Sequence, residues 1–259
     1  MSLRYALAVA ALGLPSAALA DPQPFESVEP PTKWTVQLGA GAFSGFSPTG
    51  KSQVLAVPWA SGTYRDFIDV NPLDGVSVNV LTEDRIRVGV QLRPRFPQQD
   101  IKDLQLRRPG LGVDAGVYGY VRLPGNIVAG GYVVQDISGD HAGLEYTVSL
   151  SHRRVTPIGL ASLSLYARGG DEDRNGHVFG LSARDSTTSG LPAFAPAGGV
   201  SATGATLILL TPIGDRYAVG AFVNYEALED RAAQSPLVRG DRAGWTAGFG
   251  GVMRFQSGL

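Results

Sequence analysis

Cysteine is absent from the 259 residues of the sequence. Its absence excludes disulfide scaffolds, thiolate nucleophiles and cysteine-ligated metal sites. It also suits export into an oxidising compartment, where a stray thiol can form the wrong disulfide. An excess of charge is lacking as well, because 22 basic residues face 23 acidic ones. We therefore expect no nucleic-acid partner, which would need a basic patch or stripe.

Long apolar runs are also missing. The longest, Ala6 to Leu14, has nine residues, whereas a transmembrane helix needs roughly 20. We therefore expect no transmembrane helix in the exported chain. A chain of this kind can cross a membrane only as a closed barrel, because lipid offers no partners for unpaired backbone groups.

The first twenty residues have the three parts of a secretory signal peptide. Arg4 supplies the positive charge, the apolar run follows, and Ala18-Leu19-Ala20 forms a small-x-small cleavage site. We therefore expect residues 1–20 to be a cleaved signal peptide. The proline-rich residues 21–32 would form an extended periplasmic segment leading into a single β-barrel domain over 33–259.

Glycine is abundant, with 34 residues or about 13% of the chain, against a usual share of about 7%. Apolar and polar residues alternate with a period of two along most of the sequence, which is typical of strands with one dry and one wet face. The expected strands are 33–43, 53–61, 63–70, 75–82, 85–95, 112–123, 126–136, 143–152, 158–168, 202–211, 216–228 and 244–255.

Alternation by itself does not distinguish a soluble β-sandwich from a membrane barrel, because one is the other turned inside out. The signal peptide, the strand length of about ten residues and the aromatic residues at strand ends together favour the barrel. We therefore predict an all-β fold, a transmembrane antiparallel β-barrel of about 10–12 strands, without helices. The run 53–70 could be one strand bent at Gly62, and 177–181 could add another strand.

Several charged residues fall on the polar face of the expected strands, where a membrane barrel has its interior. The candidate barrel-lumen charges are Arg87, Arg93, Arg122, Asp114 and Glu145, with Arg95 and Asp136 beside them. They could line an anion-selective pore, or they could pair with each other and fill the barrel. We favour pairing, because interior charges of both signs occur.

The sequence offers few residues that could form a catalytic or metal site. The adjacent Ser151 and His152 would point to opposite faces of one strand, and His141 and Glu145 would lie about 13 Å apart. The acidic stretch 171–176 resembles a calcium loop but has Ser182 where the closing glutamate belongs. We read it as an acidic turn and expect no catalytic, cofactor or metal site.

The last strand has a second possible role. Gly248 to Phe255 reads GFGGVMRF, which resembles the terminal signal that the outer-membrane assembly machinery recognises. Gly250, Met253 and Phe255 are its candidate residues. The pattern departs from that signal in its first residue and in the four residues that follow Phe255.

Five segments resemble the MipA/OmpV family, the MltA-interacting outer-membrane proteins. They are Trp34–Gly45, Val57–Trp59, Tyr64–Phe67, His177–Leu191 and Asn224–Arg239, which contains the SPLV block. The resemblance implies a barrel in the cell outer membrane and does not imply catalysis. For some members it implies a scaffold that joins murein hydrolases and synthases.

The expected function is therefore a non-catalytic scaffold or envelope-organising protein linked to murein synthesis and turnover. The alternative is a narrow outer-membrane channel for small solutes. The expected partners are outer-membrane lipid, lipopolysaccharide, the assembly machinery and murein hydrolase or synthase proteins.

Overall fold

The computed structural model describes residues 34–46, 54–65, 67–96, 98, 100–140 and 142–257. The expected signal peptide (1–20), the segment 21–32 and His141 lie outside these residues.

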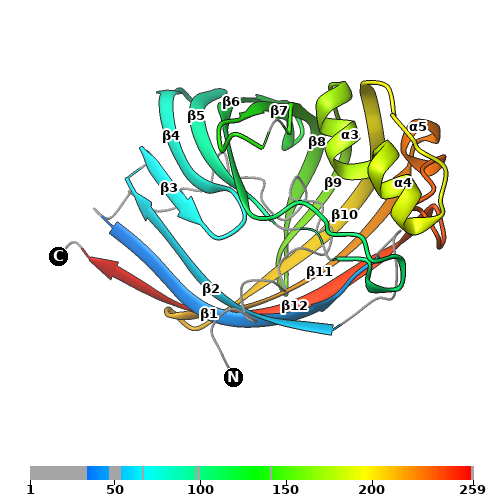
Figure 1. Cartoon of the computed structure of the whole chain (residues 1–259). Helices are drawn as coiled ribbons and strands as arrows, with labels where there is room; N and C mark the ends of the chain where they lie inside the picture. The colour runs from blue at the N-terminus through cyan, green and yellow to red at the C-terminus, as the bar shows by residue number, and fades with distance from the viewer. Residues whose placement is uncertain are drawn as a thin grey trace.

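The chain forms one closed antiparallel barrel in which each strand pairs with its neighbours in sequence (Figure 1). The first strand also pairs with the last, from Trp34 opposite Ser257 to Ser44 opposite Ala247, and this pairing closes the ring. The twelve strands are β1 (Trp34–Ser44), β2 (Val54–Tyr64), β3 (Ile68–Asn71), β4 (Gly75–Thr82), β5 (Ile86–Arg95), β6 (Gly112–Leu123), β7 (Ile127–Asp136), β8 (Leu144–Thr156), β9 (Gly159–Gly170), β10 (Gly199–Ile213), β11 (Tyr217–Leu228) and β12 (Ala243–Ser257).

The predicted fold class and the upper strand count are confirmed. Gly62 does not bend one long strand, because β2 continues through it to Tyr64 and β3 is a separate strand. The expected absence of helices is wrong. Among the described residues there are three α-helices, α3 (Glu172–Phe179), α4 (Ala183–Ser189) and α5 (Asp230–Ala233), and a 3-10 helix, η1 (Lys102–Leu104). The possible strand at 177–181 is therefore also wrong.

Local capping explains two of these helices. Asp171 accepts a hydrogen bond from the backbone N–H of Arg174 at the start of α3, and Ser182 accepts one from Asp185 at the start of α4. Helix α4 ends at Gly190, whose φ of 72° is the left-handed conformation that glycine adopts easily. None of the helices in the described residues is long and apolar enough to cross a membrane.

The two faces of the wall have opposite chemistry. In β5 the outward residues Val88, Val90 and Leu92 are 40–49% exposed, whereas the inward Arg87, Gln91 and Arg93 are only 5–7% exposed. The same alternation continues around the ring. Because the polar face is buried and the apolar face is exposed, the barrel has the polarity of a membrane barrel rather than that of a soluble sandwich.

The two ends of the barrel differ in their connections. The short-turn end carries both ends of the closed sheet, Trp34 and Ser257, and brief turns such as 124–126. The long-loop end carries the loops 96–111, 171–198 and 229–242 and all three α-helices, opposite the C-terminus in Figure 1. In bacterial outer-membrane barrels, short turns face the periplasm and long loops face outward.

Aromatic side chains mark both edges of the apolar band. The rings of Trp34 and Tyr64 lie 4.5 Å apart near the short-turn end, and those of Tyr225 and Trp245 lie 4.9 Å apart near the long-loop end. Such rings suit the headgroup level, because one part of each side chain is apolar and the other can be hydrated. The predicted aromatic strand ends therefore form part of two girdles.

The three long loops pack against one another over their end of the barrel. One apolar cluster joins Ile101 and Leu106 of the first loop with Leu181 of the second and Leu237 of the third. The hydroxyl of Ser235 donates to the carbonyl of Phe179 at 2.6 Å, which joins the second and third loops again. The three loops therefore form one small packed layer.

Close strand packing yields a prediction at two paired glycines. Gly119 of β6 lies directly opposite Gly131 of β7. A Cβ at Gly131 would collide with the carbonyl oxygen of Thr147, whereas a Cβ at Gly119 would meet only Cγ2 of Val88 at 3.8 Å. Gly131→Ala should therefore lower the unfolding free energy by about 1–3 kcal/mol, as overpacking does, and Gly119→Ala should have little effect. Urea titrations followed by heat-modifiable gel migration would measure both. Equal midpoints for the two variants would contradict this account.

Candidate functional site

The most distinctive interior feature is a network of buried ion pairs near the long-loop end. Arg95 of β5 contacts Asp114 of β6 at 2.6 Å, Asp136 of β7 at 3.0 Å and Asp140 of the β7–β8 loop at 2.9 Å. Arg174 of α3 contacts the other oxygen of Asp114 at 3.3 Å. Asp114 therefore lies between two guanidinium groups, which compensates for the loss of its hydration.

The same network continues across the interior through Glu145 of β8. Glu145 forms an ion pair with Arg174 and lies 3.7 Å from Arg93. It also accepts a hydrogen bond of 2.8 Å from the hydroxyl of Tyr132. The guanidinium of Arg93 lies 4.1 Å from the centre of the Tyr132 ring and 3.5 Å from Asp74. One polar cluster thus joins the β3–β4 turn and the strands β5, β6, β7 and β8 to α3.

Helix α3 brings Arg174 into this cluster. Asp171 holds the helix start through both of its carboxylate oxygens, because one accepts from Arg174 N at 2.8 Å and the other from Leu144 N at 2.9 Å. The Asn175 amide donates to the carbonyl of Ala197 at 2.9 Å, which fixes the far side of the loop. The acidic stretch that we expected to be a turn is therefore the capped start of a helix.

A second polar cluster occupies the neighbouring part of the interior. Glu226 of β11 accepts from Arg168 at 2.6 Å and from the Tyr166 hydroxyl at 2.9 Å, both on β9. Asn224 accepts from Thr206 of β10 at 2.6 Å. These contacts connect three strands across the inner wall and satisfy polar groups that would otherwise be costly to bury.

The structure places most of the candidate lumen charges together. Arg93, Asp114 and Glu145 belong to the first network, and Arg87 is buried on the same inner wall closer to the short turns. Arg122 has the expected inward phase but is exposed at the short-turn end, away from this network. Sequence reasoning missed Arg174, Asp74, Arg168 and Glu226. For Arg174 the missed signal was an N-cap aspartate followed by two acidic residues, which is a helix start.

The residues considered for catalysis lie apart. The Ser151 hydroxyl is buried and lies 2.8 Å from that of Ser164, whereas His152 is exposed on the outer wall. His177 lies on α3, and its buried Nε2 atom has no hydrogen-bond partner among the described residues. No group of three or more His, Cys, Asp or Glu residues suited to a metal ion occurs in the part of the chain that the structure describes.

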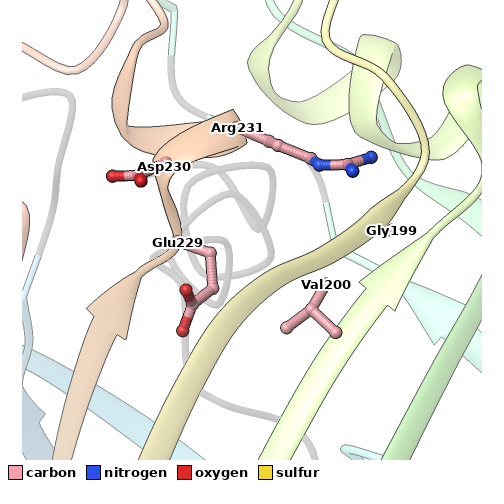
Figure 2. A pocket seen from close by; sticks show the side chains of 5 residues that line it. All are labelled: Gly199, Val200, Glu229, Asp230 and Arg231. Carbon is pink, nitrogen blue, oxygen red and sulfur yellow. The ribbon is translucent and has the colours of Figure 1, made fainter.

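A pocket of about 300 Å³ lies between the start of β10 and α5 (Figure 2). Gly199, Val200, Glu229, Asp230 and Arg231 line it. Arg231 donates to the carbonyl of Gly198, and Glu229 accepts from Thr203 at 3.0 Å. The charged lining residues are thus partly engaged in holding the loop to the strand.

Comparison with known proteins identifies the family of this barrel. A family model described as "MltA-interacting protein MipA" matches residues 38–255, nearly all of the described chain. The chain belongs to the MipA family. The resemblance seen in the sequence segments is thereby confirmed. Comparison with curated proteins gives no match.

Solved structures similar to this MipA-family barrel come from other outer-membrane proteins. A bacterial polysaccharide outer membrane secretin is 12% identical over 87% of this chain and 99% of its own, with a TM-score of 0.43. An outer membrane channel from Pseudomonas putida F1 is 11% identical over 91% of this chain and 99% of its own, with a TM-score of 0.45.

Family membership agrees with the polarity of the wall. A closed barrel with an apolar outer face, two aromatic girdles and a polar interior, in a chain of the MipA family, is a protein of the bacterial outer membrane.

The role of Arg174 in this barrel leads to a second prediction. Arg174→Met removes one partner of two buried carboxylates, Asp114 and Glu145, and such a loss typically costs about 3 kcal/mol. We expect the loop 171–198 to be cleaved faster in limited proteolysis and the barrel to unfold at lower urea. Arg184→Met on the exposed face of α4 is the matched control. Identical behaviour of the two variants would show that the network does not hold the loop.

The environment of His177 gives a third prediction. Burial, and then the charges of Arg95 and Arg174, lower its pKa to about 4, while Asp140 opposes the shift and Arg108 adds to it. An opened loop would restore the ordinary value of about 6.5. The closed loop therefore has its full stability above pH 6.5 and loses stability as the pH falls from 6.5 to 4.

Hydrogen exchange of the α3 amides, corrected for intrinsic rates, would measure this loss, and His177→Gln should abolish its pH dependence. The same acid-induced opening in His177→Gln would place the titrating group elsewhere.

Proposed function

We propose that this protein is a non-catalytic scaffold that organises the cell envelope and is linked to murein synthesis and turnover. The observation that carries the proposal is that charged side chains inside the barrel pair with one another instead of lining an open pore. Arg93, Arg95 and Arg174 pair with carboxylates across the long-loop end, and the loops above them share an apolar cluster. The description of the family, an MltA-interacting protein, supports action through protein contact.

The surface left for such contact is the short-turn end. In outer-membrane barrels this end faces the periplasm, where murein and its enzymes are located. The separation of Ser151 and His152 onto opposite faces of β8 supports a role without catalysis. Lipid and lipopolysaccharide would contact the apolar outer wall. The assembly machinery would read β12, where Met253 and Phe255 share the outer face and Gly250 faces inward.

A narrow channel is the second candidate, and one feature favours it. Gly220, Gly250 and Gly41 lie in one row on β11, β12 and β1, on the inner wall. They are half-exposed, unlike the buried inner residues near the long loops. These three glycines contribute no side chains of their own, but Cδ2 of Leu210 would lie 2.8 Å from a Cβ on Gly220. A passage for small solutes would therefore run beside Gly41 and Gly250.

Affinity capture tests the scaffold directly. The detergent-solubilised protein should retain a purified lytic transglycosylase and a murein synthase, while the heat-unfolded protein should retain neither. Replacing the exposed Arg85 and Arg216 of the short turns with Ser should weaken retention, whereas replacing Arg107 and Arg184 of the long loops should not. Failure of the native protein to retain either enzyme at micromolar concentration would end the proposal.

Conductance in planar bilayers separates the two candidates. We expect no stable steps from the native barrel, because paired charges and packed loops cover the long-loop end. Deleting 172–190, which contains α3 and α4, should produce steps by removing Arg174 and the apolar contacts of Leu181. Stable steps from the native protein would instead favour the channel.

A further inference from the structure

The charges of this barrel are divided unequally between its two ends. We count as the short-turn end the short turns, the four strand residues next to each turn, and the four residues of β1 and of β12 at the same end of the barrel. Within the described residues, eight arginines and four carboxylates lie there, a formal excess of four positive charges. The rest of the described chain has eleven basic and fifteen acidic residues, an excess of four negative charges. The opposite charge excesses at the two ends nearly cancel in the net charge of the sequence.

Part of the positive charge faces into the mouth at the short-turn end. Arg122 of β6, Arg153 of β8 and Arg254 of β12 share the inward phase of their strands, and all three are exposed or half-exposed. Strands β6 and β12 lie six positions apart in the ring of twelve, so their arginines flank the mouth from opposite sides. The Arg254 guanidinium also donates to the backbone carbonyl of Asp215 in the β10–β11 turn at 3.4 Å.

The inward position of these arginines limits what they can bind. The inward phase of these side chains directs them away from the lipid around the barrel. A folded protein is too wide for the mouth, because a barrel of twelve strands has an interior only moderately larger than one filled by side chains. An extended anionic chain does fit. Arginine suits carboxylate ligands in particular, because its planar fork can donate two parallel hydrogen bonds.

The spacing of the arginines agrees with such a ligand. Arg122 and Arg153 are separated by the single strand β7, which places their strands about 10 Å apart. Three residues of extended chain span about the same distance. A short peptide with carboxylates a few residues apart can therefore meet both arginines at once. The stem peptides of murein have this chemistry, with several free carboxylates on a short flexible chain.

We propose that the short-turn end binds the carboxylate-bearing stem peptides of murein through the inward-facing Arg122, Arg153 and Arg254. This proposal rests on the scaffold function proposed above and extends it, since the barrel then holds the polymer as well as the enzymes that act on it. Positive potential at the periplasmic mouth also raises the local concentration of an anionic ligand.

The test is co-sedimentation of the full-length barrel, in detergent, with isolated murein sacculi. The native protein should sediment with sacculi at low salt and be released by about 0.5 M NaCl, where screening acts over only a few ångströms. The triple variant Arg122→Gln, Arg153→Gln, Arg254→Gln should bind about tenfold more weakly, as the loss of three exposed ion pairs implies. The variant with Lys at the same positions should retain much of the binding.

Two controls separate charge from folding. Arg107→Gln, Arg184→Gln, Arg242→Gln removes three exposed arginines from the long-loop end and should bind like the native protein. Each variant must show the native heat-modifiable gel shift. Soluble muropeptides should compete with sacculi, and muropeptides with amidated carboxylates should not.

Each outcome gives a decision. Equal sedimentation of the native and triple Gln variants, or competition by amidated muropeptides, overturns the proposal. Competition by vesicles of anionic phospholipid but not by muropeptides also overturns it and identifies a lipid site. If sacculi are not bound while the murein enzymes are retained, the scaffold function stands and this inference alone fails.

Discussion

Pairing of main-chain hydrogen-bonding groups around a complete ring is the constraint on which this structure depends. A strand edge left open in lipid would expose several unsatisfied N–H and C=O groups, and the ladder between β1 and β12 removes that edge. Closure also determines which face of the alternating strands points toward the lipid. Once the ring is closed within a bilayer, the apolar face must point out, and the polar residues of the other face need partners in the interior, either protein groups or water.

The polar residues of the interior are arranged differently at the two ends of the barrel. Near the long loops, Asp114 and Glu145 are enclosed by guanidinium groups from the wall and from α3, so the ion network serves both to fill the barrel and to hold a loop. Near the short turns, the inner wall has glycines and half-exposed arginines. The inner wall is therefore buried near the long loops and more exposed near the short turns.

Much of the fold could be read from the sequence because its main determinant is local. Alternation in β5, for example, already assigned Arg87 and Arg93 to one face and Val88 and Val90 to the other, and the structure keeps that phase. The helices were missed for a physical reason as well. Ser182 and Gly190 are ordinary start and stop residues, but a helix of seven residues has too few intrahelical bonds to be evident without its tertiary contacts.

The sequence by itself determined the secondary structure of the wall, the inward phase of its charges and the family, because these depend on residue periodicity and on segments of contiguous chain. Only the tertiary structure decided which inward charges meet. Arg174 reaches Asp114 and Glu145 because a loop folds back over the barrel, and Arg122 stays outside the network because its strand places it at the opposite end. Such contacts join residues far apart in the chain, and they depend on closure and shear of the whole ring, which no local pattern encodes.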